Sequence, residues 1–218
     1  MKKIALSMLI ILFSAPVFAQ MEQGQQMVSL RSGLGFQLQN SGITYSSSDS
    51  RADWGSLGVE VGLSYHYLVT DQFAVGAEFS YGDYEGANLT FSSSRHVDDD
   101  TRLYNFMLSA RYTTNPASRF RFYIPFGAGL VAARQDLDID YDVQYAKKKT
   151  DTSFGYFIGA GIEFDLGHNG WALGFETRYN AFWYDTDKLV GNAPAPIHGD
   201  GNRRYEYMNF NIHVIKRF

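Results

Sequence analysis

The sequence predicts an all-β fold, an eight-stranded antiparallel up-and-down transmembrane β-barrel with short periplasmic turns and long extracellular loops. The first observation is a period-two alternation of apolar and polar residues that recurs about eight times after residue 25. The second is that short and long connections alternate between these segments. This places the short turns at one end of the barrel and the long loops at the other, which is the layout of a transmembrane β-barrel. The alternation is clearest between Leu57 and Tyr67, where the apolar face carries Leu57, Val59, Val61, Leu63, Tyr65 and Tyr67.

The first 19 residues are expected to be a secretory signal peptide, which leaves residues 20–218 as one barrel domain. Lys2 and Lys3 form a positive n-region, residues 4–13 are apolar, and residues 17–19 have the small-residue spacing of a cleavage site. Without Lys2 and Lys3 the formal charge changes from 19 − 23 = −4 to 17 − 23 = −6. An acidic exported protein is not expected to bind nucleic acid.

Cysteine is absent, so disulfides and thiol-based metal or redox sites are excluded. No apolar run after the signal peptide approaches the ~20 residues of a membrane helix. A mature chain that crosses a bilayer must therefore do so with strands that close into a barrel, because only closure satisfies every backbone group without water.

Turn-forming residues between the alternating runs set the expected strand boundaries. The strands are expected at residues 27–38, 54–68, 73–84, 102–112, 120–134, 152–164, 171–180 and 204–218. The short connections then fall at 69–72, 113–119 and 165–170, and the long polar ones at 39–53, 85–101, 135–151 and 181–203.

Aromatic residues concentrate at both ends of the outward faces, on either side of an aliphatic band. Two such girdles are typical of a barrel in a membrane, where amphipathic rings settle at headgroup level. The girdle at the short-turn end is expected to contain Tyr67, Phe73, Tyr112, Phe122, Phe164, Trp171 and Phe218. The girdle at the long-loop end is expected to contain Tyr81, Tyr104, Phe154, Tyr156, Tyr179 and Tyr207.

The inward faces combine small polar residues with four acids and four bases, which we expect to form an ion-pair network in the lumen. An isolated buried charge costs several kcal/mol or more, so these groups should be paired. Eight strands enclose only enough room for side chains, so the lumen is expected to be filled. Arg121 and Glu163 lie near the same end of adjacent strands and should be within salt-bridge reach. The network residues are Arg31, Glu60, Glu78, Arg111, Arg121, Glu163, Glu176 and Arg178.

Motifs that suggest chemistry have simpler structural explanations. Residues 126–132 match a GxGxxA dinucleotide fingerprint, but the strand pattern continues where that fingerprint needs a helix. Gly127 and Gly129, like Gly159 and Gly161, are expected to make room for large lumen neighbours. The five histidines lack a metal-binding spacing, and His66 and His213 among them should join the polar lumen. We therefore expect no catalytic residue, no metal site and no cofactor.

Two alternatives remain open beside a structural or surface-interaction role. One is a small porin or transporter for polar solutes. The other is a lipid-modifying enzyme, which would need a serine and histidine pair on the lipid-facing wall. The outward sets as assigned contain neither residue, so that alternative depends on catalytic groups in the loops.

The outward parity of the strand at 120–134 continues into a column of aspartates, toward an expected loop tip at Lys147, Lys148 and Lys149. Oxygen ligands of this kind suit divalent cations shared with lipopolysaccharide phosphates. A solvated face is the interpretation that we favour. The column consists of Asp136, Asp138, Asp140 and Asp142.

Several segments resemble the small outer-membrane β-barrel proteins of the OmpX and OmpA barrel type. Residues 59–81, with Tyr65-His66-Tyr67 followed by a short turn at Asp71 and an alternating return strand, look like the second hairpin of that family. The last strand ends in Phe218, as the assembly signal of the family does, although Lys216 replaces the aromatic residue usual two positions earlier.

The resemblance covers the whole mature chain and implies a place in the outer membrane of a Gram-negative bacterium. It implies outer-membrane lipid, lipopolysaccharide and the barrel-assembly machinery as partners. An extracellular ligand or host surface could contact the loops, and the protein is expected to be a monomer without a peptidoglycan-binding domain.

Overall fold

The computed structural model describes residues 21–38, 43–45, 57–85, 89–92, 95–140, 145–185, 197–199 and 201–218. The expected signal peptide therefore lies outside the described residues. In the described part of the chain, no helix is long and apolar enough to cross a membrane.

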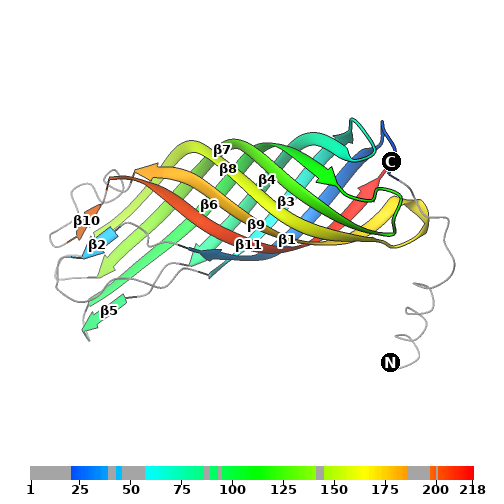
Figure 1. Cartoon of the computed structure of the whole chain (residues 1–218). Coiled ribbons are helices and arrows are strands. Elements are labelled where there is room, and N and C mark those ends of the chain that lie inside the picture. Colours follow the sequence, from blue (N-terminus) through cyan, green and yellow to red (C-terminus); the bar gives the residue numbers. More distant parts are fainter. Residues whose placement is uncertain are drawn as a thin grey trace, which may run out of the picture.

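Eight long strands form one closed antiparallel barrel, as the sequence predicted (Figure 1). Around the barrel the order is β4, β3, β1, β11, β9, β8, β7 and β6, and β6 pairs with β4 to close it. These strands are β1 (Gln26–Gln37), β3 (Leu57–Leu68), β4 (Phe73–Glu85), β6 (Arg95–Thr113), β7 (Phe120–Asp140), β8 (Tyr145–Asp165), β9 (Trp171–Asp185) and β11 (Asn202–Arg217). The shorter elements are β2 (Ile43–Tyr45), β5 (Leu89–Ser92), β10 (Ile197–Gly199) and the 3-10 turn η1 (His168–Gly170).

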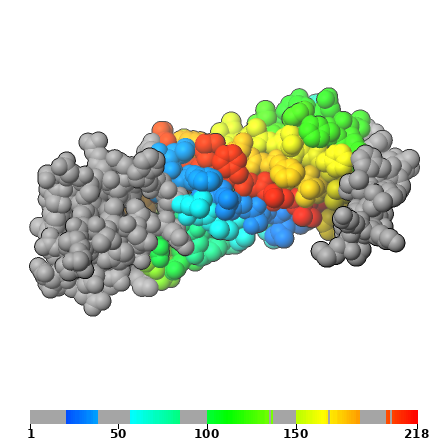
Figure 2. Space-filling model, turned by 90° about the horizontal axis from the view of Figure 1, so that it is seen from below, coloured from blue at the N-terminus to red at the C-terminus, as the bar shows by residue number. Residues whose placement is uncertain are grey.

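The first and last strands of the chain pair with each other, which brings the two ends of the barrel sequence together. The register runs from Met27 opposite Arg217 to Gln37 opposite Tyr207. Figure 2 shows these blue and red segments side by side on one face of the molecule. The C-terminus lies at the short-turn end of the barrel, and β2, β5 and β10 lie at the other end (Figure 1).

The pleat separates the two faces of the sheet as the period-two pattern requires. In β3 every odd residue from Leu57 to Tyr67 is exposed and every even residue to Leu68 is buried. The outward apolar side chains remain largely exposed, up to 75% for Leu108, which is typical of a barrel whose outer face contacts lipid.

Both aromatic girdles form on the outward face, with one correction. Tyr207 was expected in the girdle at the long-loop end, but its side chain points into the lumen and is 1% exposed. The reason is parity, because Met208 and Phe210 face outward on the same strand, so Tyr207, which directly precedes Met208, takes the opposite face. The girdle at the short-turn end is here called the lower girdle, and the other the upper girdle.

Several strands extend further beyond the upper girdle than predicted, most of all β6, β7 and β8. β6 begins at Arg95, β7 continues to Asp140, and β8 begins at Tyr145, so much of the expected loops 85–101 and 135–151 is strand. Lys147, Lys148 and Lys149 do not form the hairpin tip, since their backbones pair with residues 137, 136 and 135 of β7. Residues 141–144, between the two strands, lie outside the described part.

Glycines on the inward face lie where large side chains need space. A Cβ on Gly161 would lie 2.3 Å from Cζ of Tyr123, and one on Gly127 would lie 2.5 Å from Cε1 of Phe157. The glycine run that imitates a nucleotide-binding motif therefore serves packing inside the barrel, because these distances leave no room for a side chain.

Candidate functional site

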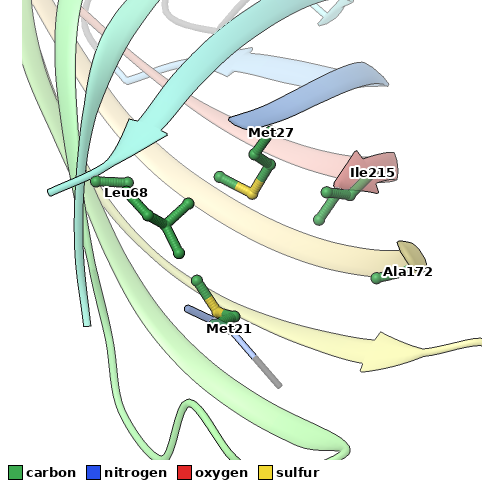
Figure 3. Close-up of a cluster of buried hydrophobic side chains, with 6 residues drawn as sticks. Met21, Met27, Leu68, Ala172 and Ile215 are labelled. Carbon is green, nitrogen blue, oxygen red and sulfur yellow. The ribbon is translucent and has the colours of Figure 1, made fainter. Parts of the chain in front are cut away.

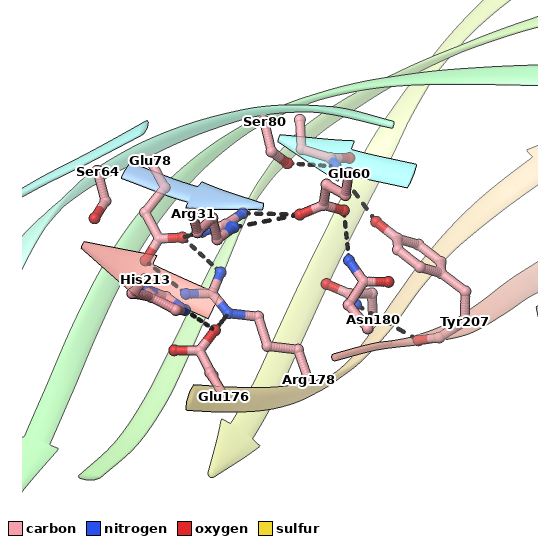
Figure 4. A network of polar contacts seen from close by, with 12 residues as sticks. Arg31, Glu60, Ser64, Glu78, Ser80, Glu176, Arg178, Asn180, Tyr207 and His213 are labelled. Atoms are coloured by element: carbon pink, nitrogen blue, oxygen red, sulfur yellow. Dashed lines mark hydrogen bonds and ion pairs between the residues drawn. The ribbon is translucent and has the colours of Figure 1, made fainter. Parts of the chain in front are cut away.

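Alternate residues of neighbouring strands meet in the lumen and form two layers of ion pairs. The middle layer consists of Arg31, Glu60, Glu78, Glu176 and Arg178, which β1, β3, β4 and β9 direct inward. All five side chains are buried, and Figure 4 shows them converging from different strands. The structure thus brings together five of the eight residues that the sequence assigned to the network.

The longest link of the middle layer crosses the whole bore. Arg178 Nη1 lies 2.6 Å from Glu78 Oε2, and β9 and β4 are four strands apart in a barrel of eight. Arg178 also pairs with Glu176, two residues away on the same strand. One guanidinium therefore ties opposite walls of the barrel together.

Arg31 completes this layer from the side of β1. Its guanidinium pairs with Glu78 and lies 3.1 Å from Glu60 Oε1. The second oxygen of Glu60 accepts a hydrogen bond of 2.5 Å from Asn209 Nδ2 on β11. Each middle-layer carboxylate thus contacts at least one charged or amide donor, which is the condition under which a buried charge is tolerated.

Two histidines flank the middle layer. His66 Nε2 lies 3.6 Å from Glu78 Oε1 and 2.9 Å from Ser109 Oγ. His213 Nε2 lies 3.5 Å from Glu176 Oε1. Both side chains are inward and buried, in the polar lumen where the sequence placed them.

The lower layer lies closer to the short turns and is centred on Glu163. Arg121 Nη1 lies 3.0 Å from Glu163 Oε1, and Arg111 and Arg217 pair with the same carboxylate. Asp165 lies 2.5 Å from Arg121 Nη2 and 2.6 Å from Arg217 Nη1. The structure thus brings together the three remaining network residues and adds Asp165 and Arg217.

Sequence reasoning missed these two additional residues, although their positions in the alternating pattern predict that both side chains point into the lumen. Arg217 follows Ile215 by two positions and Asp165 follows Glu163 by two, so both continue an inward column. They were overlooked because both lie at the expected strand ends, where turn residues and strand residues look alike.

The lumen charges balance within the described residues. The two layers together hold five arginines and five carboxylates, and every one of these ten side chains is buried. Removing one member would leave a charge without compensation in a space that offers little water, which costs several kcal/mol. The arrangement can therefore lock the strands in one register and block the bore.

Aromatic side chains fill the lumen above the middle layer, and sequence reasoning did not predict this cluster. The ring centroids of Tyr84 and Tyr207 are 5.4 Å apart, and those of Phe182 and Tyr205 are 4.9 Å apart. Asn105 Nδ2 donates to Tyr207 Oη at 3.3 Å from the strand on the opposite side of the barrel. The signal was the inward parity of these rings on β4, β9 and β11.

An apolar cluster closes the short-turn end below the lower layer (Figure 3). Met21, which precedes the first strand, is 1% exposed within it. Its backbone N–H donates to the Pro116 carbonyl at 3.3 Å, and the same oxygen accepts a hydrogen bond from Arg121 Nε. The N-terminal segment thus crosses the mouth of the barrel and is tied to the charged layer. The cluster contains Met21, Met27, Leu68, Ala74, Ala172 and Ile215.

The outward face requires a correction that concerns catalysis. Ser32 was overlooked in the lipid-facing set, yet it is exposed on β1 between Val61 and Ile212 of the neighbouring strands. Neither cross-strand neighbour can act as a base, and His66 and His213 point into the lumen. No cluster of metal-ligating side chains was found among the described residues.

Of the expected aspartate column, only the side chain of Asp136 is described. It lies 3.1 Å from Arg102 Nη1 and 3.4 Å from Arg134 Nε, above the upper girdle. Asp83 and Asp136 raise the pKa of Arg102, which stays charged. Asp136 is thus neutralised by arginines, and Asp138, Asp140 and Asp142 lie where side chains are not described.

Comparisons with known proteins point to one architecture. A family model described as the outer membrane protein beta-barrel domain matches residues 5–218. The fold is similar to Neisserial surface protein A (NspA), with a TM-score of 0.55, 16% identity, and coverage of 90% of this chain and 100% of that chain.

Two further solved structures are similar, with lower scores. Ail of Yersinia pestis matches with a TM-score of 0.45 and 13% identity, over 90% of this chain and 99% of that chain. OprG of Pseudomonas aeruginosa matches with a TM-score of 0.46 and 12% identity, over 91% of this chain and 99% of that chain. A search of curated protein sequences finds no significant match.

Proposed function

Because the chain belongs to the outer membrane β-barrel domain family and resides in the outer membrane, we propose that it is a non-conducting barrel that displays a β-sheet at the cell surface. The sheet consists of β5 and the outer parts of β6, β7 and β8. In this role the barrel is an anchor, and the displayed sheet and loops contact an extracellular ligand or a host surface.

The filled lumen is the observation that carries the proposal. Two layers of buried ion pairs, an aromatic cluster above them and an apolar cluster below them occupy successive levels of the bore. Glu78 and Arg178 connect opposite walls, so a solute would have to break a buried ion pair to pass. That barrier favours a sealed barrel.

The strand extensions support the display role. Tyr104 of the upper girdle pairs with Ala132, and β7 continues from there to Asp140. This is roughly 25 Å of strand at about 3.3 Å per residue. Backbone pairing continues on both sides of β7 in this region. His96 of β6 lies opposite Asp140, and Lys148 of β8 lies opposite Asp136, so the displayed part is an ordered sheet.

Single-cysteine labelling tests the display directly, because the chain has no cysteine of its own. Thr150→Cys places a thiol on exposed β8 above the membrane, and Ala117→Cys places one in the exposed turn between β6 and β7. A membrane-impermeant maleimide should label the first in intact cells, and the second only after the outer membrane is permeabilised. Labelling of Ala117→Cys in intact cells with protection of Thr150→Cys would invert the topology and refute the proposal.

A small pore for polar solutes is the second candidate, and one observation favours it. Asn211 has neither amide atom hydrogen-bonded to a described residue, and Tyr123 Oη is also without a described partner. A buried polar atom without a partner costs about 1–3 kcal/mol, so water would be drawn to these positions. A continuous file of such waters would be needed for passage, and ion conductance separates the two candidates.

A further inference from the structure

Lys216 is an unusual residue for the membrane-facing side of this barrel. It lies between Val214 and Phe218 in the outward column of the last strand, at the level of the lower girdle. Below Tyr81 and Tyr104, it is the only charged side chain in the described outward columns of the eight barrel strands. A charge in that position requires a counterpart in the membrane or in the protein.

The ammonium group of Lys216 is held in place by the turn between β8 and β9. Nζ donates to the backbone carbonyl of Asn169 and lies 5.4 Å from the ring centroids of both Trp171 and Phe218. Asn169 and Gly170 have positive φ values of 76° and 68°, which fold the turn against the end of β11. These contacts fix the charge beside two aromatic rings instead of leaving it on a mobile stem.

The protein does not neutralise this charge within its described residues. No described carboxylate lies within ion-pair distance of Lys216, because Glu163 and Asp165 face inward and pair with arginines. One main-chain oxygen of Phe218 accepts a hydrogen bond from the Gln26 N–H at 3.2 Å. An ammonium has three donors, and Asn169 uses one, so two remain for an external anion.

We propose that Lys216, together with Trp171 and Phe218, binds the phosphodiester of an anionic glycerophospholipid in the periplasmic leaflet. The lower girdle sets the depth of the site at the headgroups, where rings pack against glycerol and ester groups. The ammonium meets the phosphate there through charge-assisted hydrogen bonds. The free phosphate ion has the same chemistry but lacks the acyl chains that the neighbouring apolar wall would contact.

Arg119 provides a second cationic group on the same rim. Its guanidinium lies 4.4 Å from the ring centroid of Phe164, and its Nε donates to the Asp165 carbonyl at 3.1 Å. Arg119 precedes β7, which is three strands from β11, or about 14 Å at ~4.8 Å per strand. At that separation Arg119 would contact a neighbouring lipid and not the one bound at Lys216, so the site at Lys216 is tested alone.

The test measures which lipids the refolded protein retains. The protein is placed in nanodiscs of phosphatidylcholine and phosphatidylglycerol, released in the gas phase, and its bound lipids are counted by native mass spectrometry. Wild type and Lys216→Arg should retain phosphatidylglycerol enriched about fivefold over the nanodisc composition, the factor expected for one basic side chain at a headgroup. Lys216→Met, which keeps the apolar stem, should lose this enrichment.

Lys147→Met is the matched control, since it removes the same charge from β8 beyond the upper girdle. It should retain lipid as wild type does. Folding of each variant is checked by heat-modified gel mobility, and Lys216→Gln replaces Lys216→Met if the latter does not refold.

Two results would overturn the proposal. One is equal phosphatidylglycerol enrichment in Lys216→Met and wild type, which is the outcome if the lysine merely reaches the interface without binding. The other is a lack of enrichment in wild type. Inorganic phosphate is added in a parallel series, and displacement of the lipid by phosphate alone would show that the site recognises the free ion and not the lipid.

Discussion

Arg121 and Glu163 lie directly opposite each other on β7 and β8, with 3.0 Å between Nη1 and Oε1. The sequence predicted this proximity from inward parity at the same end of adjacent strands. The structure shows that the pair is part of a larger group, because Glu163 also binds Arg111 and Arg217. Arg121 in turn contacts Asp165 and the Pro116 carbonyl.

Replacing Glu163 should therefore destabilise the barrel more than replacing Arg121. Glu163→Gln leaves Arg121 and Arg217 with Asp165 and leaves Arg111 without an ion pair among the described residues, whereas Arg121→Gln leaves Glu163 two other partners. Breaking a buried pair costs roughly 3–5 kcal/mol, and less where lumen water screens the charge. Urea unfolding of the refolded protein in lipid vesicles measures the loss for each variant.

The double variant should lose less free energy of unfolding than the sum of the single variants, because each single change unbalances the lumen charge by one unit and the other change restores the balance. A coupling energy indistinguishable from zero would show that the two side chains do not share the lumen.

The faces of the strands could be predicted from the sequence because pleat parity is a local property of the backbone. The partners across the lumen could not. Glu78 and Arg178 are 100 residues apart on opposite strands, and their contact depends on the closure and stagger of the whole barrel. Parity alone says only that both point inward.

Strand ends were also poorly predicted, for a physical reason. Inside the membrane, contact with lipid requires apolar outward residues. Above the membrane both faces of the sheet meet water or polar groups, so the alternation of apolar and polar residues becomes weak. The extensions of β6, β7 and β8 lie in this region, so residues such as Lys147 were assigned to a hairpin tip. Tyr207 was misassigned and Ser32 was overlooked for a different reason, because an amphipathic ring or a small hydroxyl is compatible with either face.

Gly161→Ala should destabilise the barrel by about 1–3 kcal/mol, the usual cost of overpacking. The added Cβ would lie 2.3 Å from Cζ of Tyr123, and the ring cannot swing away because Arg111 stacks on it at 3.7 Å. Gly174→Ala is the control, since its nearest neighbour lies at 3.3 Å. Combining Gly161→Ala with Tyr123→Leu should restore part of the loss, and additive losses would refute this account of the glycine.

Phe218→Ala should lower the amount of barrel in the outer membrane with little effect on the stability of refolded protein. The side chain is 69% exposed, so it contributes little to packing, and the alanine variant keeps the backbone hydrogen bonds to Gln26. Phe120→Ala removes another exposed ring at the short-turn end that is not C-terminal. Immunoblots of outer-membrane fractions should show a loss for Phe218→Ala alone, and equal levels of both variants would contradict an assembly role.

Ion conductance of the refolded protein in a planar lipid bilayer tests most directly whether the lumen is sealed. The ion pair between Glu78 and Arg178 and the layers above and below it predict a flat current, with a general porin as positive control in the same bilayer. Gel mobility of the recovered protein confirms that it was folded when measured. Stable current steps from wild-type protein would mean that a continuous water path passes the charged layers, which would contradict the sealed barrel and favour the pore.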